Sequence, residues 1–336
     1  MTAQALPEIA NVDRRTFEED IRPAGRPVVL RQVGRDWPAV QAAQRSAEEG
    51  VAYLRRFSHG EPVAAILGEP SIGGRFFYND DLTGMNFVRG QTPLDPFLAR
   101  LLRDRDRSEP FAMAVQSVPL PTLLPGFAEA NATDLVAPDV VPRIWLGNAI
   151  RVATHYDLME NVGVVVMGRR RFTLFPPDQV ANLYMGPLEL TPAGTPVSLV
   201  DPDAPDLARF PRFADAAKVA QSATLAPGDA IYIPFHWWHA VESLDPVNAF
   251  VNYWWNAAPA ELGNPYDALL HALLAIAPLP EDQRDAFRAV FEHLVFRGHG
   301  DPSGHLPDNA KGVLGPIDAT TAARIRATLR DSLARP

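Results

Sequence analysis

Thr154-His155-Tyr156-Asp157 is the stretch of sequence that decides the fold, because it places an imidazole and a carboxylate two residues apart. Side chains two residues apart in a β-strand point to the same face, so both could reach one ion. A second imidazole, His239, ends the apolar run YIPFHWWH at residues 232–239. Two histidines and one carboxylate on one face of a metal form the facial triad of non-haem Fe(II) oxygenases. The sequence therefore predicts a metal site formed by His155, Asp157 and His239.

The composition restricts the kind of site that the chain can hold. Its 336 residues include no cysteine, which excludes disulfides, zinc fingers, iron–sulfur clusters and thiol nucleophiles. The net charge of −9 argues against a non-specific nucleic-acid binder. No window approaches the roughly 20 apolar residues that a membrane helix needs, and the N-terminus has no signal-peptide pattern. We therefore expect a cytoplasmic protein with no membrane or nucleic-acid partner.

Short strand-like runs dominate residues 111–257. Pro- and Gly-containing turns separate them, and many short strands with such turns indicate a sandwich or a barrel. Residues 186–214 interrupt the runs and are rich in Pro and Asp, so we expect a long loop of the kind that contacts substrate. The predicted strands are Phe111–Val118, Arg143–Gly147, Asn161–Met167, Arg171–Phe175, Ala230–Ile233 and Ala249–Trp255.

Mixed elements precede this β-rich part, and helices follow it. In residues 1–110 we expect a strand at 26–31 and helices at 46–57 and 94–103, with Ser46 capping the first helix. In residues 258–336, apolar residues at helical spacing predict three amphipathic helices at 266–276, 280–296 and 320–333. Two interpretations stay open for these helices: they pack on the β-core, or they form a homodimer interface.

Further motifs around the triad resemble those of the JmjC/cupin-8 family, and within it those of an asparaginyl hydroxylase. The strong match covers about residues 143–256, and a weaker one covers residues 25–30 and 36–38. The order and spacing of so many elements make the resemblance specific. Besides the triad, the matching elements are Asn161, GRRRFTLFPP at 168–177, PGDAIYIP at 227–234, Trp237-Trp238-His239 and VNYW at 251–254.

The resemblance implies a mainly β fold with helices, namely a double-stranded β-helix or jelly roll that binds Fe(II) and uses 2-oxoglutarate as co-substrate. It carries His155, Asp157 and His239 over as the iron ligands. Asn161 and Asn252 correspond to family asparagines near the C1 end of 2-oxoglutarate. The chain would then be a dioxygenase that hydroxylates a protein side chain or a small molecule.

Two positions depart from the pattern of that asparaginyl hydroxylase. Arg170 stands where it has a lysine that reaches the distal carboxylate of 2-oxoglutarate. An arginine can hold a carboxylate through two parallel hydrogen bonds, so we expect Arg170 to anchor the co-substrate. Strand alternation separates Arg170 from Arg169 and Arg171; the alternative is that all three form a solvated basic edge. Val152 replaces a threonine that assists the same carboxylate, which removes one hydrogen bond.

These departures keep two other functions open. One is a metal-binding cupin with chemistry that does not use 2-oxoglutarate, and the other is a non-catalytic binding protein with this fold. His236 lies three residues before His239, so on a strand it would face the opposite side. We expect it to line the substrate mouth or to support the ligands, and we expect Tyr156 to face away from the metal.

Overall fold

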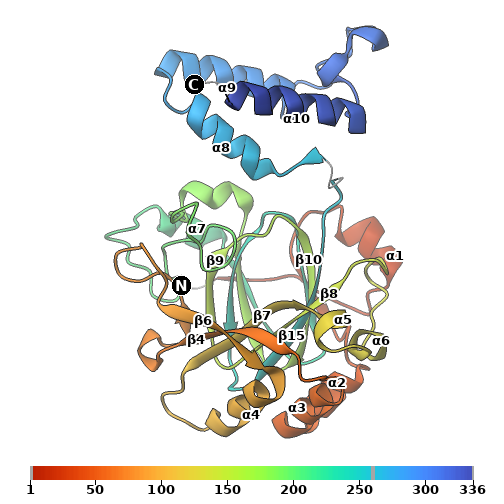
Figure 1. The fold of residues 1–336 in the computed structure, drawn as a ribbon, viewed down its shortest axis with the longest axis vertical. Coiled ribbons are helices and arrows are strands. Elements are labelled where there is room, and N and C mark those ends of the chain that lie inside the picture. Colours follow the sequence, from red (N-terminus) through yellow and green to blue (C-terminus); the bar gives the residue numbers. More distant parts are fainter. Residues whose placement is uncertain (1–2, 259–261, 335–336) are drawn as a thin grey trace. The chain divides into compact units, whose positions relative to one another are not determined.

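The structure, a computed structural model, describes residues 3–258 and 262–334 and divides the chain into two compact units (Figure 1). The first unit is Met1–Asn256 and the second is Ala257–Pro336. The predicted β-rich part lies in the first unit except for its last residue, Ala257. Residues 1–110 contribute strands to the same two sheets as residues 111–256, so the first unit has no division near residue 110.

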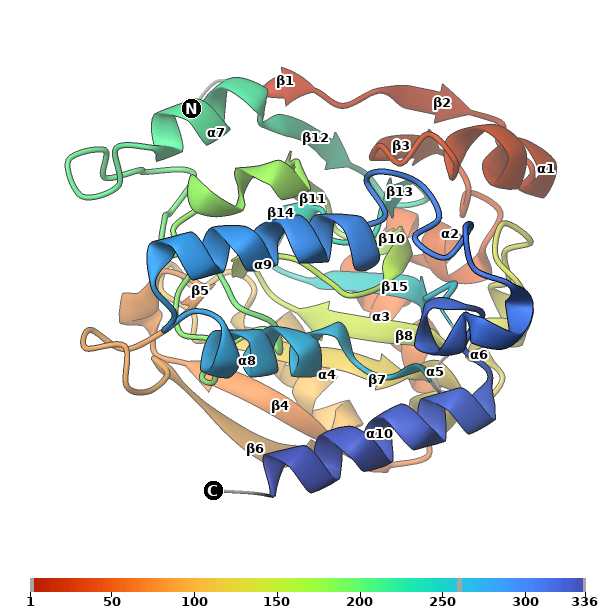
Figure 2. The ribbon, with the colours of Figure 1, turned by 90° about the horizontal axis from the view of Figure 1, so that it is seen from above.

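The first unit is mainly β with flanking helices, as predicted. A nine-stranded sheet has the order β2-β3-β13-β10-β15-β8-β7-β4-β6, and a six-stranded sheet has the order β1-β12-β11-β14-β9-β5. Figure 2 shows β15, β8, β7, β4 and β6 following one another in the larger sheet. The strands are β1 (Gln4–Ala5), β2 (Glu8–Ala10), β3 (Val28–Arg31), β4 (Pro62–Gly68), β5 (Arg75–Phe76), β6 (Phe87–Pro93), β7 (Ala112–Pro119), β8 (Pro142–Gly147), β9 (Arg151–His155), β10 (Glu160–Met167), β11 (Arg170–Phe175), β12 (Gln221–Leu225), β13 (Ala230–Ile233), β14 (Trp238–Ser243) and β15 (Asn248–Trp255).

Helices of the first unit pack on the larger sheet, except the one at residues 213–219, whose Phe213 contacts Phe175 of β11 in the smaller sheet. The predicted cap is present, because the Ser46 side chain accepts a hydrogen bond from the backbone N–H of Glu49. Leu54 of α3 and Leu98 of α4 pack in one cluster with Val164 of β10. The helices of this unit are α1 (Arg14–Thr16), which continues as one π-helical turn (Phe17–Ile21), α2 (Pro38–Arg45), α3 (Ala47–Arg55), α4 (Leu94–Asp104), α5 (Leu120–Leu123), α6 (Phe127–Ala130) and α7 (Phe213–Val219).

Alternation along most of the central strands separates the helix-covered core from the interior between the sheets. On β10, Val162, Val164 and Val166 belong to the helix-covered cluster, whereas Val165 packs between the sheets. The neighbouring β15 repeats the pattern, because Val251 faces the helices and Phe250 faces the interior. Polar side chains on the interior face are therefore enclosed by both sheets, which is where the predicted site residues lie.

The second unit is helical, as the sequence predicts. Its helices are α8 (Pro265–Ala275), α9 (Glu281–Leu294) and α10 (Ala319–Leu333). Neither α8 nor α9 buries a residue, and α10 buries Ala322. Among the residues that the structure describes in both units, no helix has the length and apolar character needed to cross a bilayer.

The sequence did not predict every element. Elements without a predicted counterpart are strands β1, β2, β6 and β12 and helices α1, α2, α5, α6 and α7. Strands β9 and β14 were expected only through the stretches at residues 154–157 and 232–239. The run at residues 232–239 is also divided, because β13 ends at Ile233 and β14 begins at Trp238. His239 is therefore the second residue of β14 and not the last residue of the strand that contains Tyr232. Its partner across the sheet is His155 of β9.

The turn between β10 and β11 requires a glycine. Gly168 has φ +72°, and a Cβ there would lie 2.7 Å from the carbonyl oxygen of Val247. Gly60 also has a positive φ, +82°, but a Cβ there would meet nothing within 4 Å. We expect Gly60→Ala to destabilise the first unit by about 1–2 kcal/mol through backbone strain alone. We expect Gly168→Ala to cost more, because strain and a backbone clash add.

Urea unfolding followed by tryptophan fluorescence measures both costs. All 6 tryptophans lie between residues 37 and 255, so the fluorescence reports on the first unit. Equal costs for the two alanine variants would contradict the proposed clash at Gly168.

Candidate metal centre

His155 and His239 face each other across two paired strands. His155 is the last residue of β9 and lies opposite His239 on β14, with 4.3 Å between the ring centroids. Both rings are buried, with 8% and 4% of each residue exposed. The register between β9 and β14 shifts just beyond this pair, since Val241 lies opposite Val152. One extra residue on β9 therefore lies between the two pairs, which is how a β-bulge redirects a side chain.

Asp157 completes the group from a position beyond the strand. Its Oδ2 lies 3.6 Å from Nε2 of His239, and ligand atoms of His155, Asp157 and His239 all lie within 4.8 Å of one another. The structure brings the three side chains together, but not by strand alternation, because β9 ends at His155. The turn after β9 brings Asp157 to the group. In the described part of the chain, no other group of three or more such side chains converges in this way.

The two imidazoles are oriented as metal ligands. Nδ1 of His155 lies 2.9 Å from the carbonyl oxygen of Ala153, and Nδ1 of His239 lies 3.0 Å from that of Trp237. A ring nitrogen that donates to a carbonyl leaves Nε2 with a free lone pair, which is the usual arrangement behind a metal-binding histidine. Oδ2 of Asp157 is buried without a hydrogen-bond partner. The donor set therefore fits a divalent cation.

Burial keeps His239 in the form that binds metal. Desolvation, assisted by the nearby charge of His155, lowers the pKa of His239 to about 4. The ring is then neutral at neutral pH, and a neutral imidazole is the ligand form. Water can solvate these three polar groups only weakly, so their burial costs free energy. A bound ion that contacts all three would offset this cost.

Asn161 and Asn252 lie side by side on the interior face of the larger sheet. Nδ2 of Asn252 donates to Oδ1 of Asn161 at 3.2 Å, and the indole N–H of Trp145 donates to Oδ1 of Asn252 at 2.7 Å. Both asparagines are buried, with 6% and 1% exposed. The structure thus joins Asn161 and Asn252 in one hydrogen-bond network. Trp145 was not expected in it, because in the sequence it is one more apolar residue of a predicted strand.

Arg170 is a buried cation without an acidic partner. It is 7% exposed, whereas the side chains of Arg169 and Arg171 are 57% and 39% exposed and pair with Asp245 and Asp203. Among the described residues no carboxylate pairs with Arg170, and its Nε has no hydrogen-bond partner. Its guanidinium lies 4.8 Å from the centroid of the Phe250 ring. Burial lowers the pKa of Arg170 to about 9.

The long loop between β11 and β12 is bound to the segment that carries the ligands. Residue Val197 forms a bridge with His155, and the backbone N–H of Ser198 donates to the carbonyl of Thr154 at 2.7 Å. Oγ1 of Thr195 donates to the carbonyl of Tyr156 at 2.6 Å. The loop therefore takes the place of a neighbouring strand where β5 has ended, a role that the sequence analysis did not anticipate.

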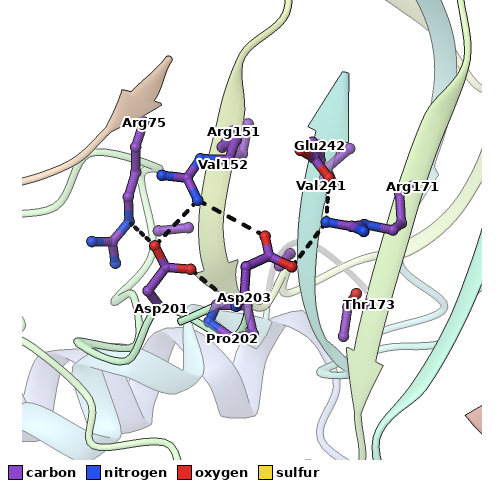
Figure 3. Close-up of a pocket in the computed structure, with 12 residues that line it drawn as sticks. Arg75, Arg151, Val152, Arg171, Thr173, Asp201, Pro202, Asp203, Val241 and Glu242 are labelled. Atoms are coloured by element: carbon purple, nitrogen blue, oxygen red, sulfur yellow. Dashed lines mark hydrogen bonds and ion pairs between the residues drawn. The ribbon is translucent and has the colours of Figure 1, made fainter. Parts of the chain in front are cut away.

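Ion pairs on the outer face of the smaller sheet hold the next part of this loop (Figure 3). Asp201 lies 3.2 Å from Arg151, and Asp203 lies 2.8 Å from Arg171. Arg171 also pairs with Glu242 of β14. The space between these groups is about 30 Å³, so it has room for roughly one water and none for a substrate. These contacts anchor the loop and do not form a binding site.

The comparisons with known proteins agree with this geometry. Residues 14–261 match the family model of the cupin-like domain. HSPB1-associated protein 1 of Rattus norvegicus is 34% identical over 143 residues, which are 41% of this chain and 29% of that protein. tRNA wybutosine-synthesizing protein 5 of Gallus gallus is 26% identical over 322 residues, 85% of this chain and 92% of that protein. Lysine-specific demethylase JMJ31 of Arabidopsis thaliana is 37% identical over 114 residues, which are 34% of this chain and 20% of that protein.

The triad predicts a single divalent-metal site, which calorimetric titration of the protein with Mn(II) measures. His155→Ala, Asp157→Ala and His239→Ala should each weaken binding by more than the roughly 10–100-fold that the loss of an outer partner costs. His59→Ala is the control, because this histidine lies outside the converging group. Retention of wild-type affinity by any of the three triad variants would exclude that residue as a ligand.

Proposed function

Because the chain belongs to the cupin-like domain family, we propose that it is an Fe(II)- and 2-oxoglutarate-dependent oxygenase that hydroxylates a protein side chain or a small molecule. His155, Asp157 and His239 would hold the iron and leave open positions for co-substrate and dioxygen. When bound, Fe(II) with 2-oxoglutarate supplies the activation of dioxygen that oxidation of a C–H bond requires. The names of two relatives, a demethylase and a tRNA wybutosine-synthesizing protein, support an enzymatic role.

The unpaired guanidinium of Arg170 is the observation that carries the 2-oxoglutarate assignment. Arg170 lies opposite Ser243, and Leu174 on the same face of β11 lies opposite His239. Four residues of strand correspond to about 13 Å. An arginine side chain and an extended dicarboxylate can together bridge such a span. A buried cation without a counter-ion is costly, so a bound carboxylate would relieve a cost that the protein alone leaves in place.

The remaining interior residues would position the co-substrate. The Trp145 N–H fixes Asn252, which in turn holds Asn161, so both amides are oriented before a ligand arrives. The Phe250 ring supports the guanidinium of Arg170 from one face. A Cβ at Gly163 would overlap this ring, so the glycine makes room for it. Val152 cannot supply the hydrogen bond of the corresponding family threonine, because its side chain has no hydroxyl group.

A second candidate substrate is a tRNA nucleoside. It is favoured by the similarity to tRNA wybutosine-synthesizing protein 5, which extends over 85% of this chain. The net charge of −9 opposes it, because binding to phosphates depends on basic side chains. Succinate formation that rises on addition of total tRNA, but not on addition of peptides or small metabolites, would favour this candidate over hydroxylation of a protein side chain or a small molecule.

Anaerobic titration of the Fe(II)-loaded protein with 2-oxoglutarate tests the proposal through the visible metal-to-ligand charge-transfer band. Wild-type protein should develop the band, and Arg170→Met should need at least tenfold more 2-oxoglutarate, because hydrogen bonds to charged groups contribute about 1.5–3 kcal/mol. Arg170→Lys should restore part of the affinity, since it keeps the charge. Arg169→Met is the matched control, because that guanidinium faces outward and pairs with Asp245.

The outcomes separate the proposal from its alternatives. A protein that binds metal stoichiometrically but develops no band would have cupin chemistry without 2-oxoglutarate. A protein that binds no metal would be a non-catalytic member of this fold. A band that Arg170→Met leaves unchanged would place the distal carboxylate on another residue.

We also propose that the second unit forms a homodimer through α8. One side of this helix, with Ala268, His271 and Ala272, lines a groove of about 640 Å³ shared with α9 and α10. Its other residues include a row of exposed leucines, 41–69% exposed, which are Leu269, Leu270, Leu273 and Leu274. A contiguous row of apolar side chains on a helix is normally covered by another surface. An uncharged leucine face is complementary to its own copy across a two-fold axis, as closed dimers require.

Leu270→Glu combined with Leu273→Glu should convert the dimer to a monomer, because two carboxylates per protomer would face each other across the axis. Light scattering coupled to gel filtration measures the mass of each form. Val88→Glu is the control, since Val88 is 65% exposed on β6 in the first unit. A monomeric wild-type protein at micromolar concentration would contradict the homodimer.

A further inference from the structure

His236 adopts a backbone conformation that a non-glycine residue rarely takes. It lies in the turn between β13 and β14, three residues before His239, and its φ is +65°. The left-handed region is strained for residues with a Cβ, and such strain persists where the surrounding structure fixes it. The contacts of His236 therefore indicate what holds the turn in this shape.

Two contacts join His236 to the other segment that carries metal ligands. Its backbone N–H donates to the carbonyl oxygen of Asp157 at 3.1 Å. Its ring stacks on Tyr156, with 4.1 Å between centroids and 22° between planes. Tyr156 also contacts Trp238, in an edge-to-face arrangement with 4.5 Å between the ring centroids. We call His236, Tyr156 and Trp238 the aromatic latch.

The aromatic latch alternates in sequence with the ligands. Tyr156 lies between His155 and Asp157, and Trp238 directly precedes His239. Asp157 lies beyond the end of β9, where pairing with β14 no longer fixes the backbone. The hydrogen bond from His236 and the stack on Tyr156 supply the connection that the strands no longer provide.

We propose that His236 is a positioning residue, whose left-handed turn and stack on Tyr156 set where Asp157 stands relative to His239. His236 does not bind the metal itself, because its ring lies against Tyr156 and it is outside the converging group. This inference rests on metal binding by the triad and is independent of the reaction. It would survive a failure of the 2-oxoglutarate assignment.

The backbone and ring contributions can be separated by substitution. His236→Gly keeps the left-handed turn and removes the stack, whereas His236→Tyr keeps an aromatic ring. We expect His236→Gly to weaken Co(II) binding about 10–100-fold, as for other residues that orient ligands. His236→Tyr should lose less than about 10-fold in Co(II) affinity, because the ring that stacks on Tyr156 is kept. Calorimetry of the full-length metal-free protein gives the affinities.

Two further readouts distinguish positioning from loss of fold. The visible d–d spectrum of bound Co(II) should change in His236→Gly and return in His236→Tyr, while the melting temperature of the metal-free protein stays close to wild type. Gln32→Gly is the control, since Gln32 also has a positive φ, +62°, but is exposed and lies away from the ligand segments in the first unit. It should leave both the Co(II) affinity and the spectrum unchanged.

Tyr156→Leu tests the other half of the stack. If the two rings act as one unit, Tyr156→Leu should weaken Co(II) binding as His236→Gly does, and the double variant should be no weaker than either single variant. Should His236→Gly fail to fold, His236→Asn replaces it, because asparagine also tolerates the left-handed region. Wild-type Co(II) affinity in His236→Gly, or additive losses in the double variant, would overturn the proposal.

Discussion

The pairing of β9 with β14 is the constraint on which the rest of the site depends. It places His155 opposite His239, and the register shift beyond them separates this pair from Val152 and Val241 by an extra residue on β9. A strand slipped by one residue would turn a ligand to the outer face, because the side-chain period is two. The loop at residues 195–198 and the ion pairs to Asp201 and Asp203 therefore stabilise the site from outside, by holding the edge that β5 leaves open.

The interior contains polar groups that the protein itself does not satisfy. Oδ2 of Asp157 and Nε of Arg170 are buried without partners, and the two groups have opposite charges. Folding with both groups in place costs free energy that a core of apolar residues would not. A cation near Asp157 and an anion near Arg170 would offset both costs. The two orphaned atoms therefore support a metal and a carboxylate ligand together more strongly than either atom does alone.

Much of the fold was predictable because the pattern was local. The apolar run at residues 161–167 marked β10, and Ser46 marked the start of α3 through its hydroxyl. The missed strands lack such a pattern. Strand β12 is polar and half-exposed, and the turn at residues 234–237 divided a run that looked continuous. Their identity as strands comes from pairing with β11 and β9, which are distant in sequence.

The sequence by itself determined which side chains can act as ligands, because the types and order of His155, Asp157, His239 and Arg170 are chemical facts independent of folding. Strand alternation also indicated that Arg170 and Arg171 face opposite sides, although a shared solvated edge stayed open as the alternative. Only the tertiary structure decided that Asp157 reaches the group from a turn, that Arg170 lacks a counter-ion and that His236 stacks on Tyr156. Each of these depends on contacts between segments separated by many residues, and such contacts exist only once both sheets have closed around the interior.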